Sequence, residues 1–138
     1  MWTITKEFKR DMAHRLPSYQ GKCYNVHWHT YKCLITLQGK DLQKEWWQKG
    51  MLWDFWLLRP IKEWLDENWD HAYVGCKEDE VLQFLEEKGY RTYTMDEDPT
   101  AENMSKFLFD RFRKEFPIKE ITIYETPTSF STYNWADE

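Results

Sequence analysis

The chain has 138 residues, a length that suits one domain because two cores would leave each half with too little buried surface. Its 41% hydrophobic and 31% charged residues exclude a disordered chain, and its net charge of -5 disfavours binding to nucleic acid except through a local basic patch. No apolar run approaches the about 20 residues that span a bilayer, and no secretory pattern opens the chain, so we expect a cytoplasmic protein without a membrane partner.

Two early segments, residues 2–8 and 27–38, alternate apolar and polar side chains with the period of two that β-strands have. A polar loop over residues 17–22 lies between them. We therefore predict two strands, and the apolar face of the second consists of Tyr31, Cys33, Ile35 and Leu37.

Two segments in the middle of the chain have helical character. Apolar side chains between Phe55 and Leu65 recur at spacings of three and four, and Pro60 implies that the regular helix either starts near this residue or bends there. A second, shorter helix is predicted over residues 79–88, with Asp79 near its start and Gly89 in the left-handed conformation after its end.

The clearest helix signal begins at Asp98, a capping side chain followed by Pro99 at the first helical position and Glu102 in the first turn. Its buried stripe consists of Met104, Phe107, Leu108 and Phe112.

Three further strands are predicted over residues 90–95, 120–125 and 130–135. The combination of strands and helices predicts an α+β fold, an antiparallel sheet with helices packed on one face. We expect residues 1–138 to form a single domain.

Two features of the composition bear on the environment of the protein. Three cysteines, an odd number in a chain without an export signal, favour free thiols over disulfides. The aromatic share of 18%, with nine tryptophans, exceeds what one small core needs. We therefore expect some aromatic side chains to lie in a subunit interface of a homo-oligomer or in a ligand pocket.

The four histidines provide the main evidence about function. His27 and His29 are two residues apart on a predicted strand, so both side chains project from one face and can share a metal ion, while Trp28 points to the other face. His14, at the loop-proximal end of the first strand, could supply a third nitrogen. Three protein ligands with an open position are the catalytic arrangement of Zn2+, although a His-x-His pair alone also fits two polar surface histidines.

Three other groups could take part in catalysis or binding. Cys23 is close enough in sequence to His27 to lie beside a metal whose charge favours the thiolate, and the alternative is a small buried apolar side chain. The dipeptide Asp70-His71 could exchange protons at neutral pH, although it is common in proteins. Glu125 ends a strand and is either a pocket carboxylate or a solvated strand end.

These residues resemble motifs of the 6-pyruvoyl-tetrahydropterin synthase and 6-carboxytetrahydropterin synthase family, and the resemblance extends along nearly the whole chain. The gap of three residues between Cys23 and His27 is similar to that of the carboxytetrahydropterin branch of queuosine and 7-deazaguanine synthesis, whereas the pyruvoyl branch commonly has a longer gap. The segments that carry the resemblance are residues 12–17, 23–29, 53–55, 69–73, 98–103 and 124–126.

The resemblance implies a tunnelling fold (T-fold), in which the antiparallel sheets of several subunits, a trimer or a hexamer, close into a barrel with sites between neighbouring subunits. It also implies conversion of 7,8-dihydroneopterin triphosphate to 6-carboxy-5,6,7,8-tetrahydropterin, with loss of acetaldehyde and triphosphate. In this scheme His14, His27 and His29 hold Zn2+, which polarises the developing carbonyl, and Cys23 as thiolate removes a carbon-bound proton.

The same resemblance implies roles for five further residues. His71, oriented by Asp70, moves a second proton. Glu125 accepts hydrogen bonds from the pterin ring, and the helix start at Thr100 and Ala101 adds backbone contacts to it.

Within the segments that carry the resemblance, the sequence departs from the family pattern at Trp28 and at Asp98. Trp28 stands where the family usually has glycine, and Asp98 replaces the usual asparagine as a helix cap. Triphosphate also requires cations, and the choice among Lys22, Arg15 and the other basic residues stays open.

Other functions remain compatible with the sequence. Within the enzyme class, a 6-pyruvoyl-tetrahydropterin synthase uses a similar site to eliminate triphosphate while it keeps the side chain. A non-catalytic zinc module or pterin-binding relative is the alternative from another class, because fold and metal do not prove turnover. A carbohydrate or protein contact surface formed by the tryptophans lacks a repeated aromatic spacing.

Overall fold

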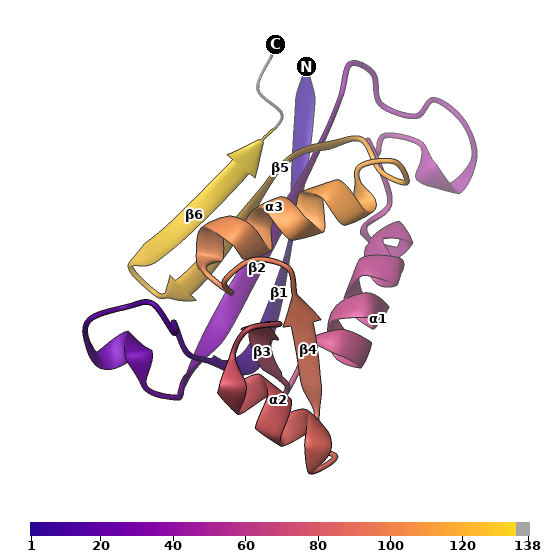
Figure 1. The fold of residues 1–138 in the computed structure, drawn as a ribbon. Coiled ribbons are helices and arrows are strands. Elements are labelled where there is room, and N and C mark those ends of the chain that lie inside the picture. The colour runs from indigo at the N-terminus through magenta and orange to yellow at the C-terminus, as the bar shows by residue number, and fades with distance from the viewer. Residues whose placement is uncertain (135–138) are drawn as a thin grey trace.

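The computed structural model describes residues 1–134 and contains a curled six-stranded sheet in the order β4-β3-β1-β2-β5-β6, with three α-helices (Figure 1). Trp135, at the end of the last predicted strand, lies outside the described residues. The strands are β1 (Trp2–His14), β2 (His27–Gly39), β3 (Tyr73–Cys76), β4 (Thr92–Met95), β5 (Ile118–Thr126) and β6 (Ser129–Asn134), and the helices are α1 (Arg59–Asn68), α2 (Glu80–Glu87) and α3 (Ala101–Phe112).

The centre of the sheet is the long antiparallel pair formed by β1 and β2. Its register runs without interruption from Trp2↔Gly39 to His14↔His27. The first predicted strand is therefore confirmed but continues for six residues past Phe8, where polar side chains mask the alternation. Met12 is buried in this extension and lies on the same face as Phe8, so the period of two persists to the end of β1.

The prediction of a wholly antiparallel sheet is wrong for two strands. The pairs β1-β2, β2-β5 and β5-β6 are antiparallel, whereas β3 pairs in parallel with both β1 and β4. All four residues of β3 are buried, and a strand covered on both faces shows no alternation, so its sequence contains no strand signal of the kind used above. The α+β class is confirmed.

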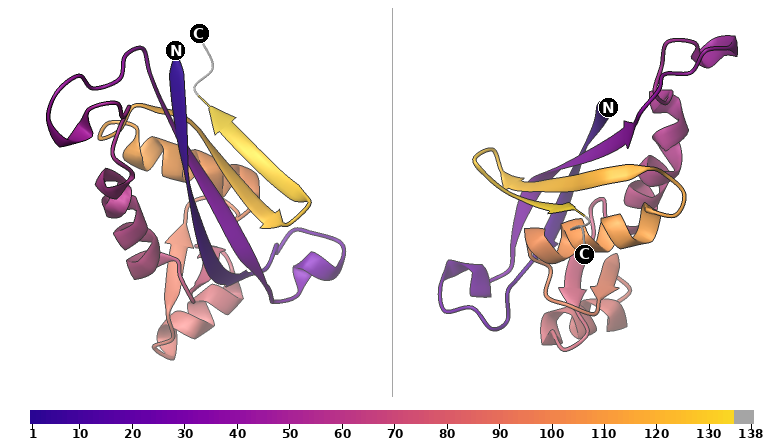
Figure 2. Two further views of the ribbon diagram at one scale, coloured as in Figure 1. Left: turned by 180° about the vertical axis from the view of Figure 1, so that it is seen from behind. Right: turned by 90° about the horizontal axis from the view of Figure 1, so that it is seen from above.

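The three helices lie on one face of the sheet, as the two further views show (Figure 2). Helix α1 starts at Arg59 with Pro60 in its first turn, after a 3-10 turn over Phe55–Leu58, so the alternative of a start near the proline holds. The core between the helices and the sheet includes Tyr31, Cys33, Ile35, Leu37, Leu58, Ile61, Leu65, Trp69, Met104, Leu108, Phe109, Phe112, Ile121 and Ile123.

The predicted capping residues are confirmed for α2 but not for the start of α3. In α2 the Asp79 side chain accepts from the N–H group of Val81, and Gly89 has a φ of 81° after the helix, both as predicted. In α3 the cap is Thr100, whose hydroxyl accepts from the Asn103 N–H group, and the prediction of Asp98 as the cap is wrong.

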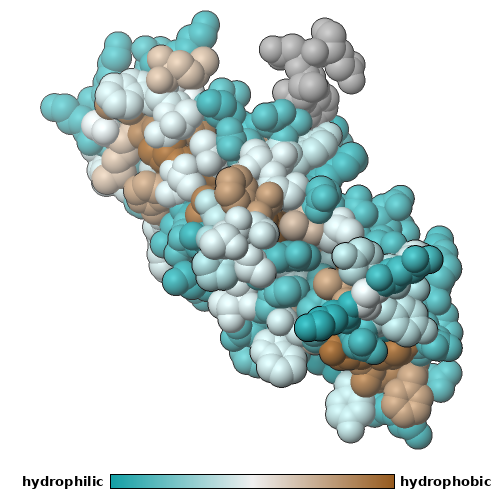
Figure 3. Space-filling view, turned by 90° about the vertical axis from the view of Figure 1, so that its left-hand side faces the viewer, coloured by the Kyte–Doolittle hydropathy of each residue, from teal (hydrophilic) through white to brown (hydrophobic). Residues whose placement is uncertain are grey.

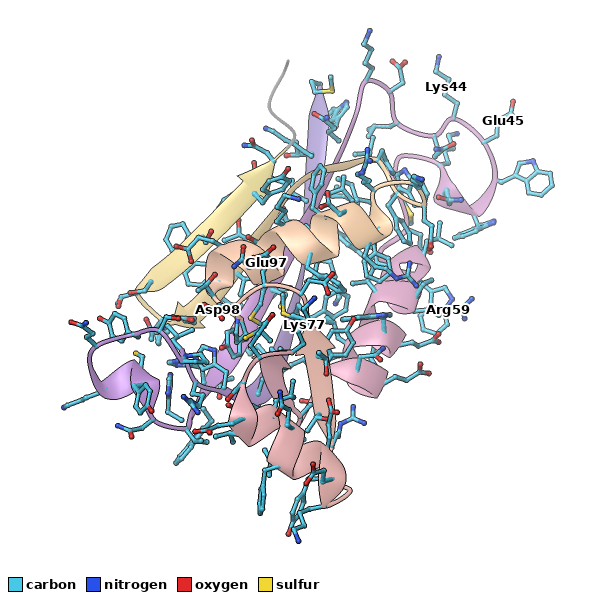
Figure 4. The ribbon with its side chains drawn as sticks, in the orientation of Figure 1. Lys44, Glu45, Arg59, Lys77, Glu97 and Asp98 are labelled. Carbon is cyan, nitrogen blue, oxygen red and sulfur yellow. The ribbon has the colours of Figure 1, made fainter. Side chains whose placement is uncertain are left out.

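Asp98 lies on the loop that leads into α3 (Figure 4). Its carbonyl accepts hydrogen bonds from the Thr100 N–H group at 2.8 Å and from the Asn103 side chain at 2.9 Å. Asp98 therefore supports the helix start through its backbone, and Pro99 lies before the helix instead of at its first position.

Side chains of hydrophilic and intermediate character cover most of the face in Figure 3, with apolar side chains gathered in small patches. Within residues 1–134, no helix has the length and apolar character needed to span a bilayer.

Candidate metal centre and active site

Three histidines converge at one end of the β1-β2 pair. His14 ends β1 and lies directly opposite His27, the first residue of β2, while His29 follows two residues later on the same face. The ring centroids are 4.5 Å apart for His14 and His27, 5.2 Å for His14 and His29, and 4.9 Å for His27 and His29. One nitrogen of each ring lies within 4.8 Å of the others, so this cluster can bind a metal ion.

Backbone carbonyls orient two of these rings. The Nδ1 atom of His14 lies 2.8 Å from the carbonyl oxygen of Pro99, and the Nδ1 atom of His27 lies 2.8 Å from that of Asn25. A carbonyl oxygen only accepts, so both Nδ1 atoms donate, and in the neutral rings the Nε2 atoms carry lone pairs.

These two Nε2 atoms face each other at 3.0 Å. Nitrogens bound to a tetrahedral zinc ion at about 2.0–2.1 Å lie roughly 3.3 Å apart, close to this separation. Because two lone pairs would repel at this distance without a cation or proton between them, the donor set fits a metal ion.

Burial favours the neutral form of two of the imidazoles, His14 and His29. Desolvation, reinforced by the neighbouring imidazoles, lowers the pKa of His14 to about 4, and only the hydrogen bond to Pro99 opposes this shift. Burial and the charge of His27 also lower the pKa of His29. Both shifts favour the unprotonated ring, which is the form that coordinates a cation.

Tyr31 is a residue of the site that the sequence reasoning did not identify. Its hydroxyl lies 3.1 Å from Nδ1 of His14, and its side chain is buried. Desolvation, together with the charge of Glu125, raises the pKa of Tyr31 well above its usual value, so the phenol stays protonated. The available signal was its position on the same strand face as His27 and His29, two residues further on.

Glu125, at the end of β5, lies near the histidine cluster. Its Oε1 atom is 4.0 Å from Nε2 of His14. Burial, and secondarily the charge of Glu102, raises the pKa of Glu125. This carboxylate is half-buried beside the cluster, which favours the pocket carboxylate over the solvated strand end.

The start of α3 lies beside the same cluster. The carbonyl of Pro99 binds His14, which places the following residues, Thr100 and Ala101, next to the site. The N–H group of Thr100 already donates to Asp98, whereas the N–H group of Ala101 is in the first helical turn, where amides lack an intrahelical partner.

Cys23 lies on a 3-10 turn over Lys22–Tyr24 and is neither fully buried nor exposed. Its carbonyl accepts from the Leu16 N–H group at 2.7 Å, which ties this loop to the end of β1. The Cys23 thiol also contributes to the raised pKa of Tyr31, so it lies near enough to interact with the cluster. All three cysteines are free thiols, as predicted.

Asp70 and His71 lie just before β3, along the edge of β1 that faces away from β2. His71 Nδ1 is 3.1 Å from Asp70 Oδ2, and the backbone N–H of His71 donates to the carbonyl of Asp11. The side chain of His71 is 74% exposed. Within residues 1–134, no hydrogen bond, ion pair or ring contact joins it to the three clustered histidines, so a single subunit does not bring these two groups together.

Arg15 is engaged in a buried network. Its guanidinium lies 3.3 Å from the Asp79 carboxylate and 4.7 Å from the ring centroid of Tyr24, while the Tyr73 hydroxyl donates to Asp79 at 2.5 Å. The network connects the Cys23 loop to the start of α2. Because Arg15 is buried and already paired, it is a poor candidate for binding an external anion.

The Asp79→Ala variant is expected to lose about 3–5 kcal/mol of unfolding free energy, because it leaves the Arg15 charge buried without its main partner and removes the α2 cap. Urea unfolding would measure this loss. Glu80→Ala is the matched control: Glu80 is 4.0 Å from Arg15 but 83% exposed, so its removal should change stability by less than about 1 kcal/mol. Equal losses in both variants would contradict the structural role of Asp79.

Comparison with known proteins shows the family to which the chain belongs. Residues 3–136 match the family model described as 6-pyruvoyl tetrahydropterin synthase. The 6-carboxy-5,6,7,8-tetrahydropterin synthase of Haemophilus influenzae is 36% identical over 140 residues, covering 96% of this chain and 99% of the relative. The protein of the same name from Rickettsia felis is 32% identical, covering 94% and 98%.

Solved structures show the same fold. An uncharacterized protein from Wolinella succinogenes superposes with a TM-score of 0.83 at 20% identity, covering 96% of this chain and 97% of the other. The 6-pyruvoyl tetrahydropterin synthase of Caenorhabditis elegans superposes with a TM-score of 0.71 at 22% identity, covering 98% and 96%. The expected T-fold architecture of the subunit is confirmed.

Proposed function

Since this chain belongs to the 6-pyruvoyl tetrahydropterin synthase family, we propose that it is a zinc-dependent 6-carboxy-5,6,7,8-tetrahydropterin synthase of queuosine or 7-deazaguanine synthesis. Its substrate would be 7,8-dihydroneopterin triphosphate, and acetaldehyde and triphosphate would be released. The convergence of three imidazole nitrogens beside Glu125 is the observation that carries this proposal, together with full-length relatives of that name.

His14, His27 and His29 would hold the metal. Three neutral imidazoles with an open position suit zinc better than magnesium or calcium, which prefer oxygen ligands. When bound, zinc supplies a Lewis acid that polarises oxygens of the substrate side chain.

Glu125 would bind the pterin ring. Its half-buried carboxylate can accept hydrogen bonds from the amino and N–H groups of the ring, and an interaction of this kind is stronger where water is excluded. The N–H group of Ala101 would add a backbone contact, while Thr100 would hold the helix start in place through its capping bond to Asn103.

Cys23 would act as the base that removes a carbon-bound proton, because the residue is only partly buried and its thiol lies near the cluster. His71, held by Asp70, would move the second proton. Since these two groups lie apart in one chain, we propose that a neighbouring subunit supplies Asp70 and His71 in a trimer or hexamer. The exposed aromatic side chains, which include Trp2, Trp28, Trp46, Trp47, Trp56 and Phe130, provide apolar surface for such contacts.

Incubation of the zinc-loaded protein with 7,8-dihydroneopterin triphosphate tests the proposal. We expect mass spectrometry to detect 6-carboxytetrahydropterin and acetaldehyde in equal amounts. A product that keeps its three-carbon side chain would instead identify a 6-pyruvoyl-tetrahydropterin synthase. Binding of substrate without any product would identify a non-catalytic relative.

A further inference from the structure

The segment that joins α1 to β3 holds His71 in an uncommon backbone conformation. His71 has a φ of 59°, in the left-handed region that residues with a Cβ atom rarely adopt. Its N–H group donates to the carbonyl of Asp11 at 2.7 Å, and the N–H group of Ala72 donates to the carbonyl of Trp69 at 3.0 Å. A strained conformation persists only where surrounding contacts hold it, so the contacts of this segment determine how the His71 side chain is presented.

Asp70 joins this segment to β1 through both of its carboxylate oxygens. Its Oδ1 atom accepts from the N–H group of Asp11 at 3.3 Å, and its Oδ2 atom lies 3.1 Å from Nδ1 of His71. A carboxylate only accepts hydrogen bonds, so Nδ1 of His71 donates to it, and in the neutral ring the lone pair lies on Nε2. Asp70 therefore selects one tautomer of an imidazole that is 74% exposed.

Arg91, the residue before β4, binds the backbone of the same segment. Its Nε atom donates to the carbonyl of Asp70 at 2.7 Å, and its Nη2 atom donates to the carbonyl of Asp66 at 2.5 Å. The Asp66 carbonyl is in the last turn of α1, where carbonyls lack intrahelical partners. The carbonyl of Arg91 accepts from the N–H group of Tyr73 at 3.0 Å, which ties Arg91 to β3. The guanidinium fork thus connects the end of α1 to the residue that orients His71.

We propose that Arg91 is a positioning residue for His71. This assignment rests on the proposed function, in which His71 moves a proton. Arg91 acts through Asp70, because two charge-assisted hydrogen bonds from one rigid guanidinium fix the backbone that carries the orienting carboxylate. Without these bonds the segment can relax, and the imidazole loses its fixed direction and tautomer.

Nuclear magnetic resonance of the zinc-loaded protein with isotope-labelled histidine tests the positioning without turnover. The chain has four histidines, so the signals lost in His71→Ala identify the His71 ring. Under conditions where this ring is neutral, we expect the proton on Nδ1 in the wild-type protein and a mixture of both tautomers in Arg91→Met. Arg59→Met is the matched control, because Arg59 is exposed at the start of α1, with its guanidinium 4.6 Å from the ring centroid of Trp56, and should leave the signals unchanged.

Turnover of 7,8-dihydroneopterin triphosphate separates positioning from a general structural role. A small misplacement of a reacting group can cost about 100-fold in rate, so Arg91→Met should lose about 10- to 100-fold in kcat, with little change in KM and with zinc retained. Arg91→Lys should lose less, because it keeps a cation but not the fork. In the His71→Ala background, Arg91→Met should cause no further loss, because its effect passes through His71.

The positioning role is wrong if the His71 tautomer stays unchanged in Arg91→Met, or if Arg59→Met changes it equally. It is also wrong if Arg91→Met leaves kcat of an active protein unchanged, or slows the His71→Ala protein further. Failure of the proposed function has a different signature, in which the tautomer still changes in Arg91→Met but the wild-type protein forms no pterin product.

Discussion

The His29→Ala variant is expected to lose bound zinc and turnover together. His29 supplies one of three imidazole nitrogens that lie within 4.8 Å of one another. Its removal leaves two, whereas catalytic zinc sites have three protein ligands and structural sites have four. Loss of a supporting group around a metal typically costs about 10–100-fold in affinity, so loss of a direct ligand should cost at least about 100-fold. Metal analysis after dialysis, with one zinc per chain expected in the wild-type protein, measures the effect.

His71→Ala provides the matched histidine control. Its side chain is 74% exposed and pairs with Asp70, so the variant should keep a full complement of zinc. The proposed function adds that it should still lose turnover, because His71 would move a proton. Full zinc retention in His29→Ala, or zinc loss in His71→Ala, would refute the assignment of the metal ligands.

The Cys23→Ala variant should have the second large effect, a loss of turnover with zinc retained. Removal of a general base costs about 100- to 10,000-fold in rate, whereas the three imidazoles that would bind the metal do not depend on the thiol. Steady-state turnover and metal analysis on the same preparation measure the two quantities. A variant that keeps most of its rate would show that the protein does not use this thiol, as expected of a binding module.

Cys33→Ala is the matched cysteine control. Burial raises the pKa of Cys33 to about 12, so this thiol stays protonated and unreactive. Its replacement should lower stability slightly by removing a buried atom but leave the rate per folded molecule unchanged. An equal loss of rate in both variants would mean that the loss in Cys23→Ala arises from structural damage.

Local patterns in the sequence determined those elements whose signals lie within a few residues. The alternation over residues 27–38 predicted β2, which starts at His27 and ends at Gly39. Asp79 and Gly89 predicted the two ends of α2, because a capping side chain and a left-handed glycine act on their immediate neighbours. The same locality made the His27 and His29 pair recognisable, since alternation along one strand places both side chains on one face.

Tertiary structure decided the features that depend on contacts between distant segments. Strand β3 is covered on both faces, so it lacks alternation. The cap of α3 shifted from Asp98 to Thr100 where the intervening carbonyl of Pro99 binds His14, a residue 85 positions earlier in the chain. A single segment contains no information about such a partner.

The register of β1 against β2 had the largest consequence for function. It places His14 opposite His27, and a shift by one residue would send every side chain of a strand to the other face. The sequence by itself therefore identified the imidazoles as candidate metal ligands and placed His27 and His29 on one strand. Only the pairing of strands, which depends on their mutual packing and hydrogen bonds, decided that a third imidazole completes the cluster while Asp70 and His71 lie at another edge.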